Sequence, residues 1–233
     1  MTADTEAQIG GDLFAVARTG RDGSRVLIGD VRGKGLAAIG EANVVLGAFR
    51  EGVRRCESLS ALVRAMEDSV SADLEDVADT DRDPGEHFVT ALVLDLPDAT
   101  RQGTMISCGH PAPLLLHDGA VALLESGTPN SPLGLSSLHA PQFRSDSFAF
   151  ADGDTLLLYT DGVTEARSPQ GVFYPLAERA ATFPPAGPEA LLQHLLRDVV
   201  AHTGGRLADD VAVLAIERLP ARTGGTAPAR PGT

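Results

Sequence analysis

The amino-acid sequence predicts an α+β fold in which antiparallel sheets are covered by helices. Strand-like runs and helical runs occupy separate stretches of the chain and do not alternate one by one. Asp-Gly turns stand between several neighbouring strand-like runs, as in antiparallel hairpins. A doubly wound nucleotide-binding fold would require strict alternation, which is absent. With 233 residues, 43% of them hydrophobic, the chain is predicted to form one domain with a substantial core.

The first part of the chain is predicted to form a strand hairpin followed by two helices. Leu13–Arg18 and Arg25–Val31 are the strands, and Gly20–Ser24 supplies the turn. Apolar residues then recur at steps of three and four, which is the spacing of one helical face, at Ile39, Ala42, Leu46, Phe49 and Val53. The second helix carries its apolar stripe at Leu59, Leu62, Val63, Met66, Val70, Leu74 and Val77.

The second part of the chain is predicted to be rich in strands. They are Phe88–Leu96, Thr104–Cys108, Leu114–His117, Ala120–Leu124, Phe143–Phe150 and Thr155–Tyr159. A helix begins at Pro188, a residue favoured in a first turn, and Val211–Ile216 is the last strand. We therefore assign residues 1–218 to the folded domain. Residues 219–233, rich in Pro, Gly, Ala, Thr and Arg, are predicted to be a disordered tail.

The acidic balance of the chain narrows the classes of partner. Asp and Glu number 32 against 19 Lys and Arg, for a formal charge of −13. This argues against nucleic-acid binding, because affinity for nucleic acid comes mainly from cationic contacts to phosphates. Cys56 and Cys108 are too few for a cysteine-based zinc site.

The apolar runs of the chain are too short to cross a bilayer, and no signal peptide opens the chain. We therefore expect this chain to be cytoplasmic and without membrane contact. Nothing in the sequence indicates its oligomeric state.

Aspartates at the ends of predicted strands are the candidate metal ligands. Asp12 follows two glycines, Asp30 ends a strand, Asp161 follows an apolar strand, and Asp209 with Asp210 precedes the last strand. Carboxylate oxygens suit Mg²⁺ and Mn²⁺, and two such ions about 3.5–4 Å apart can activate a shared water for attack on phosphorus. Any one of these residues alone is better explained as a turn aspartate. The complete set, in one order, favours a metal site.

Five segments together resemble one enzyme family. They are Gly10–Asp12, Ile28–Gly35, Ser107–Pro111, Leu156–Ala166 and Asp209–Val211. In this order they resemble the metal-dependent serine/threonine protein phosphatases of type 2C, and within them the SpoIIE-like bacterial branch that controls sporulation and the general stress response. The resemblance implies an αββα four-layer sandwich of two antiparallel sheets flanked by helices, with two Mn²⁺ or Mg²⁺ ions at one edge.

The resemblance also assigns roles to particular residues. Asp12 matches a metal ligand, and Asp30 matches the aspartate that bridges both ions. Val31 would add its backbone carbonyl, and Asp161 and Asp209 match the remaining ligands, with Asp209 preferred to Asp210. The implied reaction is hydrolysis of phosphoserine or phosphothreonine on a partner protein by a bridging hydroxide. The implied substrate is a phosphorylated anti-sigma-factor antagonist.

The chain departs from the family pattern at two places. The family's first strand has no counterpart before Gly10, so the sandwich is expected to lack it; we expect a shortened chain whose whole protein carries an upstream sensor or membrane region. Where the bacterial branch has Ser-Gly-His-Gly, this chain has Arg32–Gly35. Arg32 could hold phosphoryl oxygens through its guanidinium, or it could belong to a solvated basic loop. These departures motivate an alternative function, a catalytically weak pseudophosphatase that acts as a binding module in signalling.

His110 is a further candidate because histidine often transfers protons at neutral pH. It lies in a Gly-His-Pro turn between two predicted strands. A structural role in a loop near the site is the favoured interpretation, with general-acid catalysis as the alternative.

Overall fold

The computed structural model describes residues 11–20, 22–33, 36–78, 87–135, 142–184, 187–207 and 209–220. The strands are β1 (Asp12–Thr19), β2 (Gly23–Val31), β3 (Val89–Pro97), β4 (Gln102–Cys108), β5 (Leu114–His117), β6 (Ala120–Leu123), β7 (Asp146–Ala149), β8 (Thr155–Tyr159) and β9 (Val213–Glu217). The helices are α1 (Leu36–Arg55), α2 (Leu59–Ala78), α3 (Asp161–Thr164), α4 (Leu176–Ala180) and α5 (Pro188–His202).

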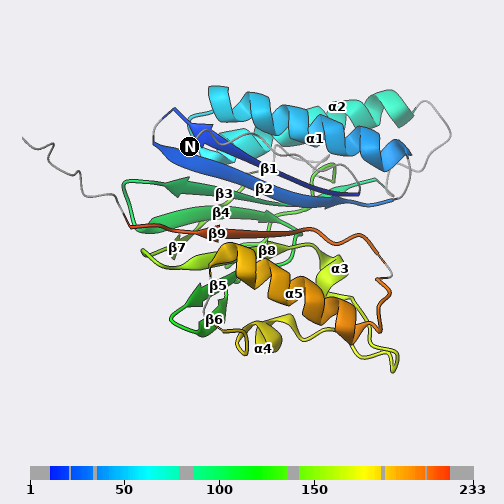
Figure 1. The fold of residues 1–233 in the computed structure, drawn as a ribbon. Coiled ribbons are helices and arrows are strands. Elements are labelled where there is room, and N and C mark those ends of the chain that lie inside the picture. The colour runs from blue at the N-terminus through cyan, green and yellow to red at the C-terminus, as the bar shows by residue number, and fades with distance from the viewer. Residues whose placement is uncertain are drawn as a thin grey trace, which may run out of the picture.

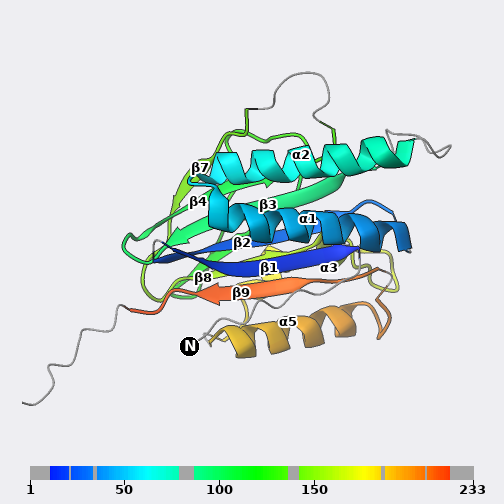
Figure 2. The ribbon, with the colours of Figure 1, turned by 90° about the horizontal axis from the view of Figure 1, so that it is seen from above.

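The strands form two stacked antiparallel sheets between two layers of helices (Figure 1). Sheet A has the order β1-β2-β3-β4-β7, and sheet B has the order β6-β5-β8-β9. The helices α1 and α2 cover the outer face of sheet A, and the view from above shows them lying side by side along it (Figure 2). The helices α4 and α5 pack against the outer face of sheet B. The predicted αββα sandwich is confirmed.

Three hydrophobic clusters separate these layers, because side chains in each strand alternate between its two faces. In β2, Leu27 and Val31 face the α1–α2 layer, whereas Val26 and Ile28 face sheet B. In β8, Leu156 and Leu158 face sheet A, whereas Leu157 and Tyr159 face α5. The fully buried Phe49 anchors α1 in the outer cluster of sheet A. The buried apolar residues of these strands therefore face either a helix layer or the other sheet.

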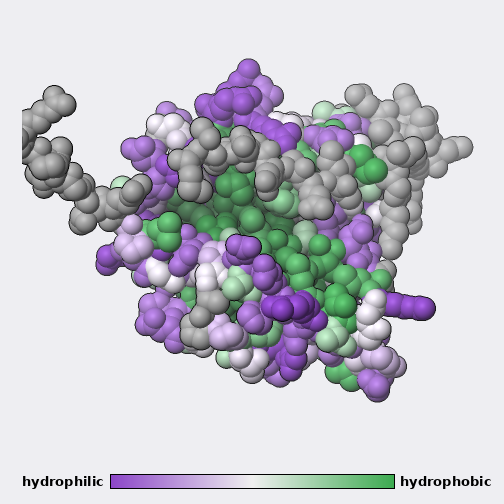
Figure 3. All heavy atoms as spheres, viewed as in Figure 1, coloured by the Kyte–Doolittle hydropathy of each residue, from purple (hydrophilic) through white to green (hydrophobic). Residues whose placement is uncertain are grey.

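The edges of the two sheets lie on one side of the molecule. There β1 ends sheet A and β9 ends sheet B. Figure 3 shows apolar side chains gathered on this face, between the α1 layer and α5. Among the apolar residues of β1, β9 and α5, Phe14, Val16, Leu214 and Ile216 are partly buried, and Leu196 and Val200 are exposed.

Two predicted strands are shorter in the structure, and two helices were not predicted. The strand expected at Phe143–Phe150 is only β7, because the backbone of Arg144 bonds to the side chain of Asn130. The last strand begins at Val213, since the Ala212 N–H is bonded to the Thr160 hydroxyl. Short helices α3 and α4 were not predicted, because four or five residues are too few to show helical periodicity.

The predictions about membrane-spanning segments and the C-terminal tail can be compared with the described residues. In the part of the chain that the structure describes, no helix is both long and apolar enough to cross a membrane. The predicted tail at 219–233 lies outside the described residues apart from Leu219 and Pro220.

Neighbouring leucines of α5 provide a matched test of the layer packing. Leu195 is 0% exposed in the cluster beneath α5, whereas Leu196 is 42% exposed. We expect Leu195→Ala to lower the free energy of unfolding by about 2–5 kcal/mol through lost burial and a cavity. Leu196→Ala should change it by about 0.5 kcal/mol or less. Urea denaturation of both variants checks this, and equal losses would contradict the assigned face of α5.

Candidate functional site

The first element of the site is a row of polar residues at one end of sheet A. Strand register places Asp12 of β1 opposite Asp30 of β2, and Asp30 opposite Thr90 of β3. By the alternation of side chains, all three belong to the face that otherwise carries inter-sheet residues such as Ile28 and Leu92. Two half-buried carboxylates therefore lie side by side where the apolar cluster ends.

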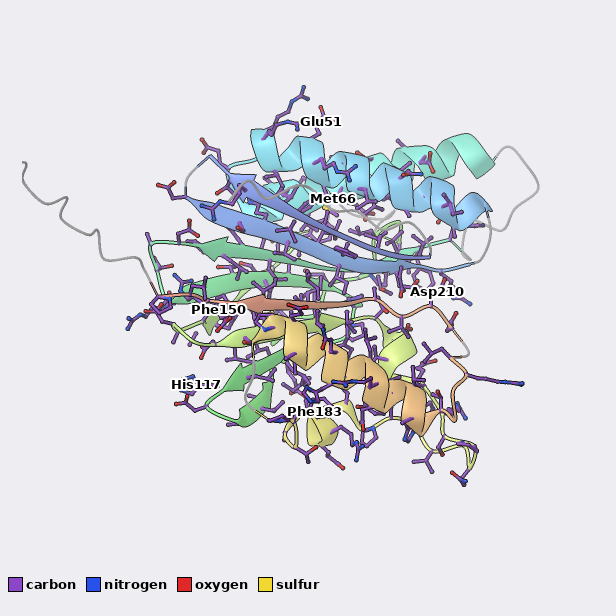
Figure 4. All side chains as sticks on the ribbon, in the orientation of Figure 1. Glu51, Met66, His117, Phe150, Phe183 and Asp210 are labelled. Atoms are coloured by element: carbon purple, nitrogen blue, oxygen red, sulfur yellow. The ribbon has the colours of Figure 1, made fainter. Side chains whose placement is uncertain are left out.

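A cavity of about 720 Å³ opens at this end of the sandwich. The residues that line it are Gly11, Asp12, Asp30, Val31, Arg32, Gly33, Ile39, Phe88, Thr90, Asp161, Leu207, Asp209 and Asp210. Figure 4 labels Asp210 at the same end as α3. His110 is not in this lining. From segments far apart in the sequence, the structure brings together Asp12, Asp30, Val31, Arg32, Asp161 and Asp209.

Thr160 connects sheet B to Asp12. Its buried hydroxyl lies 2.7 Å from Asp12 Oδ2, to which it donates, and accepts the Ala212 N–H at 3.0 Å. Its own N–H donates to the Ala212 carbonyl at 3.0 Å. Asp161 follows directly as the first residue of α3, where its carbonyl accepts the Glu165 N–H. The bond from Thr160 to Asp12 depends on the stacking of the two sheets.

Gly162 allows the last acidic segment to approach the site. A Cβ at this position would lie 2.0 Å from the backbone oxygen of Asp210. Only a residue without a side chain therefore permits α3 and the segment before β9 to pack so closely. Asp209 and Asp210 are both exposed and both line the cavity, and Asp209 Oδ1 accepts the Asp210 N–H at 3.2 Å. The geometry does not separate them as candidate ligands.

Negative charge dominates the electrostatics of the site. Burial raises the pKa of Asp30 to about 7, with further contributions from Asp12, Asp161 and Asp209. Burial also raises the pKa of Asp12, although the Thr160 hydroxyl opposes this and Asp210 adds to it. Partial desolvation and mutual repulsion both disfavour the ionised carboxylates. A bound cation would relieve both effects.

Backbone oxygens converge beside these carboxylates. A Cβ placed on Gly11 would meet Asp30 Oδ1 at 3.3 Å, the Val31 carbonyl oxygen at 3.6 Å and the Gly33 carbonyl oxygen at 3.9 Å. Such hard oxygen donors suit Mg²⁺ or Mn²⁺. As they stand, however, no three His, Cys, Asp or Glu side chains among the described residues form a group that could hold one ion. The donor set fits a divalent cation in chemistry.

Arg32 forms the cationic part of the rim. Its guanidinium carbon lies 5.1 Å from the centroid of the Phe88 ring, and the backbone N–H of Arg32 donates to the Phe88 carbonyl. The side chain is exposed and lines the cavity. Lys34 and Gly35, which complete the predicted loop, lie outside the described residues.

The fold defines the class of protein that this chain resembles. The structure of the PP2C domain of SiaA from Pseudomonas aeruginosa superimposes with a TM-score of 0.74, at 16% identity, over 90% of this chain and 81% of that one. The PP2C phosphatase domain of SpoIIE from Bacillus subtilis, solved with a fragment of its regulatory domain, gives a TM-score of 0.72 at 17% identity, over 90% of this chain and 59% of that one. The fold is that of the PP2C phosphatases.

Sequence comparison identifies the branch. The family model of Stage II sporulation protein E (SpoIIE) matches residues 20–219, so the chain belongs to this family and the predicted relationship is confirmed. Phosphoserine phosphatase RsbP of Bacillus subtilis (strain 168) is 25% identical over 163 residues, which are 70% of this chain. The chain spans only 38% of the length of that relative.

The raised pKa of Asp30 predicts how stability depends on pH. Folded Asp30 holds its proton up to about pH 7, whereas its unperturbed pKa is 3.8, so the metal-free fold loses stability as pH rises through this window. We expect Asp30→Asn to flatten this dependence and to raise the melting temperature at pH 8. The rise should be about 2–4 °C, the shift that 1 kcal/mol produces in a domain of this size.

Thermal denaturation in EDTA between pH 5 and pH 8 measures this. Asp22→Asn is the matched control, because it removes one charge from an exposed turn residue that already has a positive φ of 50°. A wild-type melting temperature that rises across the window by as much as that of Asp30→Asn would contradict the shifted pKa.

Proposed function

We propose that this chain is a metal-dependent protein phosphatase domain that hydrolyses phosphoserine or phosphothreonine on a partner protein. The observation that carries the proposal is the convergence of Asp12, Asp30, Asp161 and Asp209 on one cavity, in a chain of the SpoIIE family. A protein that served only as a scaffold would have no chemical need to gather repelling carboxylates in a half-buried site.

The proposed cofactors are two Mn²⁺ or Mg²⁺ ions. Asp30 would lie between them and Asp12 would hold one from its side, supported by the Val31 carbonyl. Asp161 and Asp209, or Asp210, would close the site from the loops at the end of sheet B. When bound, the ions would supply charge neutralisation and an activated water for in-line attack on phosphorus.

The remaining residues of the rim would place the phosphoryl group. Arg32 is the described cation of the cavity lining, and stacking on Phe88 restrains its guanidinium. A guanidinium can donate two parallel hydrogen bonds to phosphoryl oxygens. Ile39, Phe88 and Leu207 add an apolar rim against which residues flanking the phosphorylated side chain could pack.

The proposed substrate is a phosphorylated anti-sigma-factor antagonist. This follows from the resemblance to the sporulation and stress-response branch, and the similar RsbP is named a phosphoserine phosphatase. The proposed setting is cytoplasmic signalling.

Hydrolysis of p-nitrophenyl phosphate tests the activity directly. We expect turnover with Mn²⁺, its loss in EDTA, and a loss of at least about a hundredfold in Asp30→Asn, because that residue would join both ions. The same assay on phosphoserine and phosphothreonine peptides, and on a phosphorylated anti-sigma-factor antagonist, tests the substrate. A folded protein that binds Mn²⁺ but hydrolyses none of these would instead support the pseudophosphatase alternative.

Arg32 has a matched control in Arg167, whose guanidinium carbon lies 4.2 Å from the centroid of the Phe173 ring. Both arginines are exposed, but only Arg32 lines the cavity. We expect Arg32→Ala to lower kcat/KM about tenfold, since a charge-assisted hydrogen bond to phosphate is lost. Arg167→Ala should leave kcat/KM unchanged. Steady-state kinetics on p-nitrophenyl phosphate measure kcat/KM for both variants. Equal changes in the two variants would exclude the assigned role of Arg32.

A further inference from the structure

His110 lies beside the candidate site, where it joins the two sheets. It follows β4 and is only 6% exposed. Its Nε2 lies 3.1 Å from the carbonyl oxygen of Tyr159 in β8 of sheet B. Its Nδ1 lies 3.3 Å from the hydroxyl of Thr90 in β3 of sheet A. One imidazole ring therefore bridges the sheets at the end where the carboxylates gather.

The hydrogen-bond partners determine which nitrogen of the His110 ring carries hydrogen. The Tyr159 carbonyl can only accept, so Nε2 carries hydrogen and donates. In a neutral ring Nδ1 then accepts from the Thr90 hydroxyl. Burial lowers the pKa of His110 to about 4, which keeps the ring neutral at physiological pH. Both nitrogens thus have protein partners.

The backbone before His110 restrains the ring further. The carbonyl of His110 accepts the Ser107 hydroxyl at 3.2 Å. Gly109 has a φ of +72°, and a Cβ there would lie 2.8 Å from a side-chain carbon of Pro132. The backbone of this turn is therefore closely packed.

Each hydrogen-bond partner of the ring lies close to a candidate metal ligand. Thr90 stands opposite Asp30 in the β2–β3 register. Its hydroxyl also lies 3.4 Å from the Asp30 carbonyl oxygen, but its one hydrogen cannot be donated to that oxygen and to His110 at the same time. Tyr159 precedes Asp161 by two residues. The strand register connects Asp30 to Thr90, and His110 connects Thr90 to Tyr159, which lies near Asp161 in the chain. The two sheets are therefore joined by polar contacts at this end, whereas elsewhere they meet through apolar contacts.

We propose that His110 is a positioning residue that sets the separation of Asp30 and Asp161 and so prepares the site to bind divalent cations. This inference rests on the proposed metal-dependent function. It replaces the general-acid alternative, because among the described residues that line the cavity Thr90 is present and His110 is not. Hydrogen bonds suit this role, since they depend on direction as well as on distance, whereas apolar contacts are not directional.

Two variants of His110 separate positioning from simple packing. His110→Leu removes both hydrogen bonds and keeps an apolar side chain in the space. His110→Gln keeps one donor and one acceptor, which can reach Tyr159 and Thr90. Leu94→Ala is the control for lost stability, because Leu94 is fully buried on the same strand as Thr90 and faces the same inter-sheet cluster.

Mn²⁺ binding is the decisive measurement, made on the full chain by the loss of the free-ion electron paramagnetic resonance signal. Kinetics on p-nitrophenyl phosphate at saturating Mn²⁺ and melting temperatures accompany it. We expect His110→Leu to weaken Mn²⁺ binding about tenfold or more, with little change in KM, and His110→Gln to recover most of the affinity. Leu94→Ala should lower the melting temperature without changing Mn²⁺ affinity.

Unchanged Mn²⁺ affinity in a folded His110→Leu, or an equal loss in Leu94→Ala, would overturn the positioning role while leaving the phosphatase proposal in place. A folded wild-type protein that neither binds Mn²⁺ nor hydrolyses phosphate esters would overturn both. Loss of turnover in His110→Leu with full Mn²⁺ affinity would also reject this role and would restore the general-acid alternative.

Discussion

The site depends on the antiparallel register that places Asp12 opposite Asp30 at the end of sheet A. Two carboxylates on adjacent strands, both partly desolvated, repel each other, and burial with neighbouring acidic residues raises the pKa of Asp30 to about 7. The metal-free fold is therefore stabilised by a proton on Asp30, and a divalent cation would replace that proton. Ion binding and folding stability are consequently expected to be coupled at this end of the sandwich.

The rest of the structure holds this strained pair in a defined place. Over most of their area the two sheets meet through apolar side chains, whose attraction is not directional. At the site end the contact becomes polar. Thr160 bonds to Asp12, and His110 bonds to Thr90 and to the Tyr159 carbonyl. These short directional bonds tie the acidic loops of sheet B to the carboxylates of sheet A.

Much of this could be predicted from the sequence, because long elements carry a periodic signal. The two helices after β2 and most strands were found from the spacing of apolar residues such as Phe49 and Leu62. Helix α3 was missed, since four residues contain barely one turn. Asp12 and Asp30 were found from their glycine-flanked positions and the family resemblance. Asp210 remains an equal candidate beside Asp209, because the direction of an exposed carboxylate is not encoded in local sequence.

The sequence by itself determined the fold class, the alternation that buries one face of each strand, and the acidic residues available to hold a cation. Local propensity and the period of apolar residues suffice for this. Only the tertiary structure decided which polar groups meet across the sandwich, as in the bond from Thr160 to Asp12, whose residues lie 148 positions apart. Such contacts depend on how the two sheets stack and twist, and that arrangement is determined by the packing of all core side chains together.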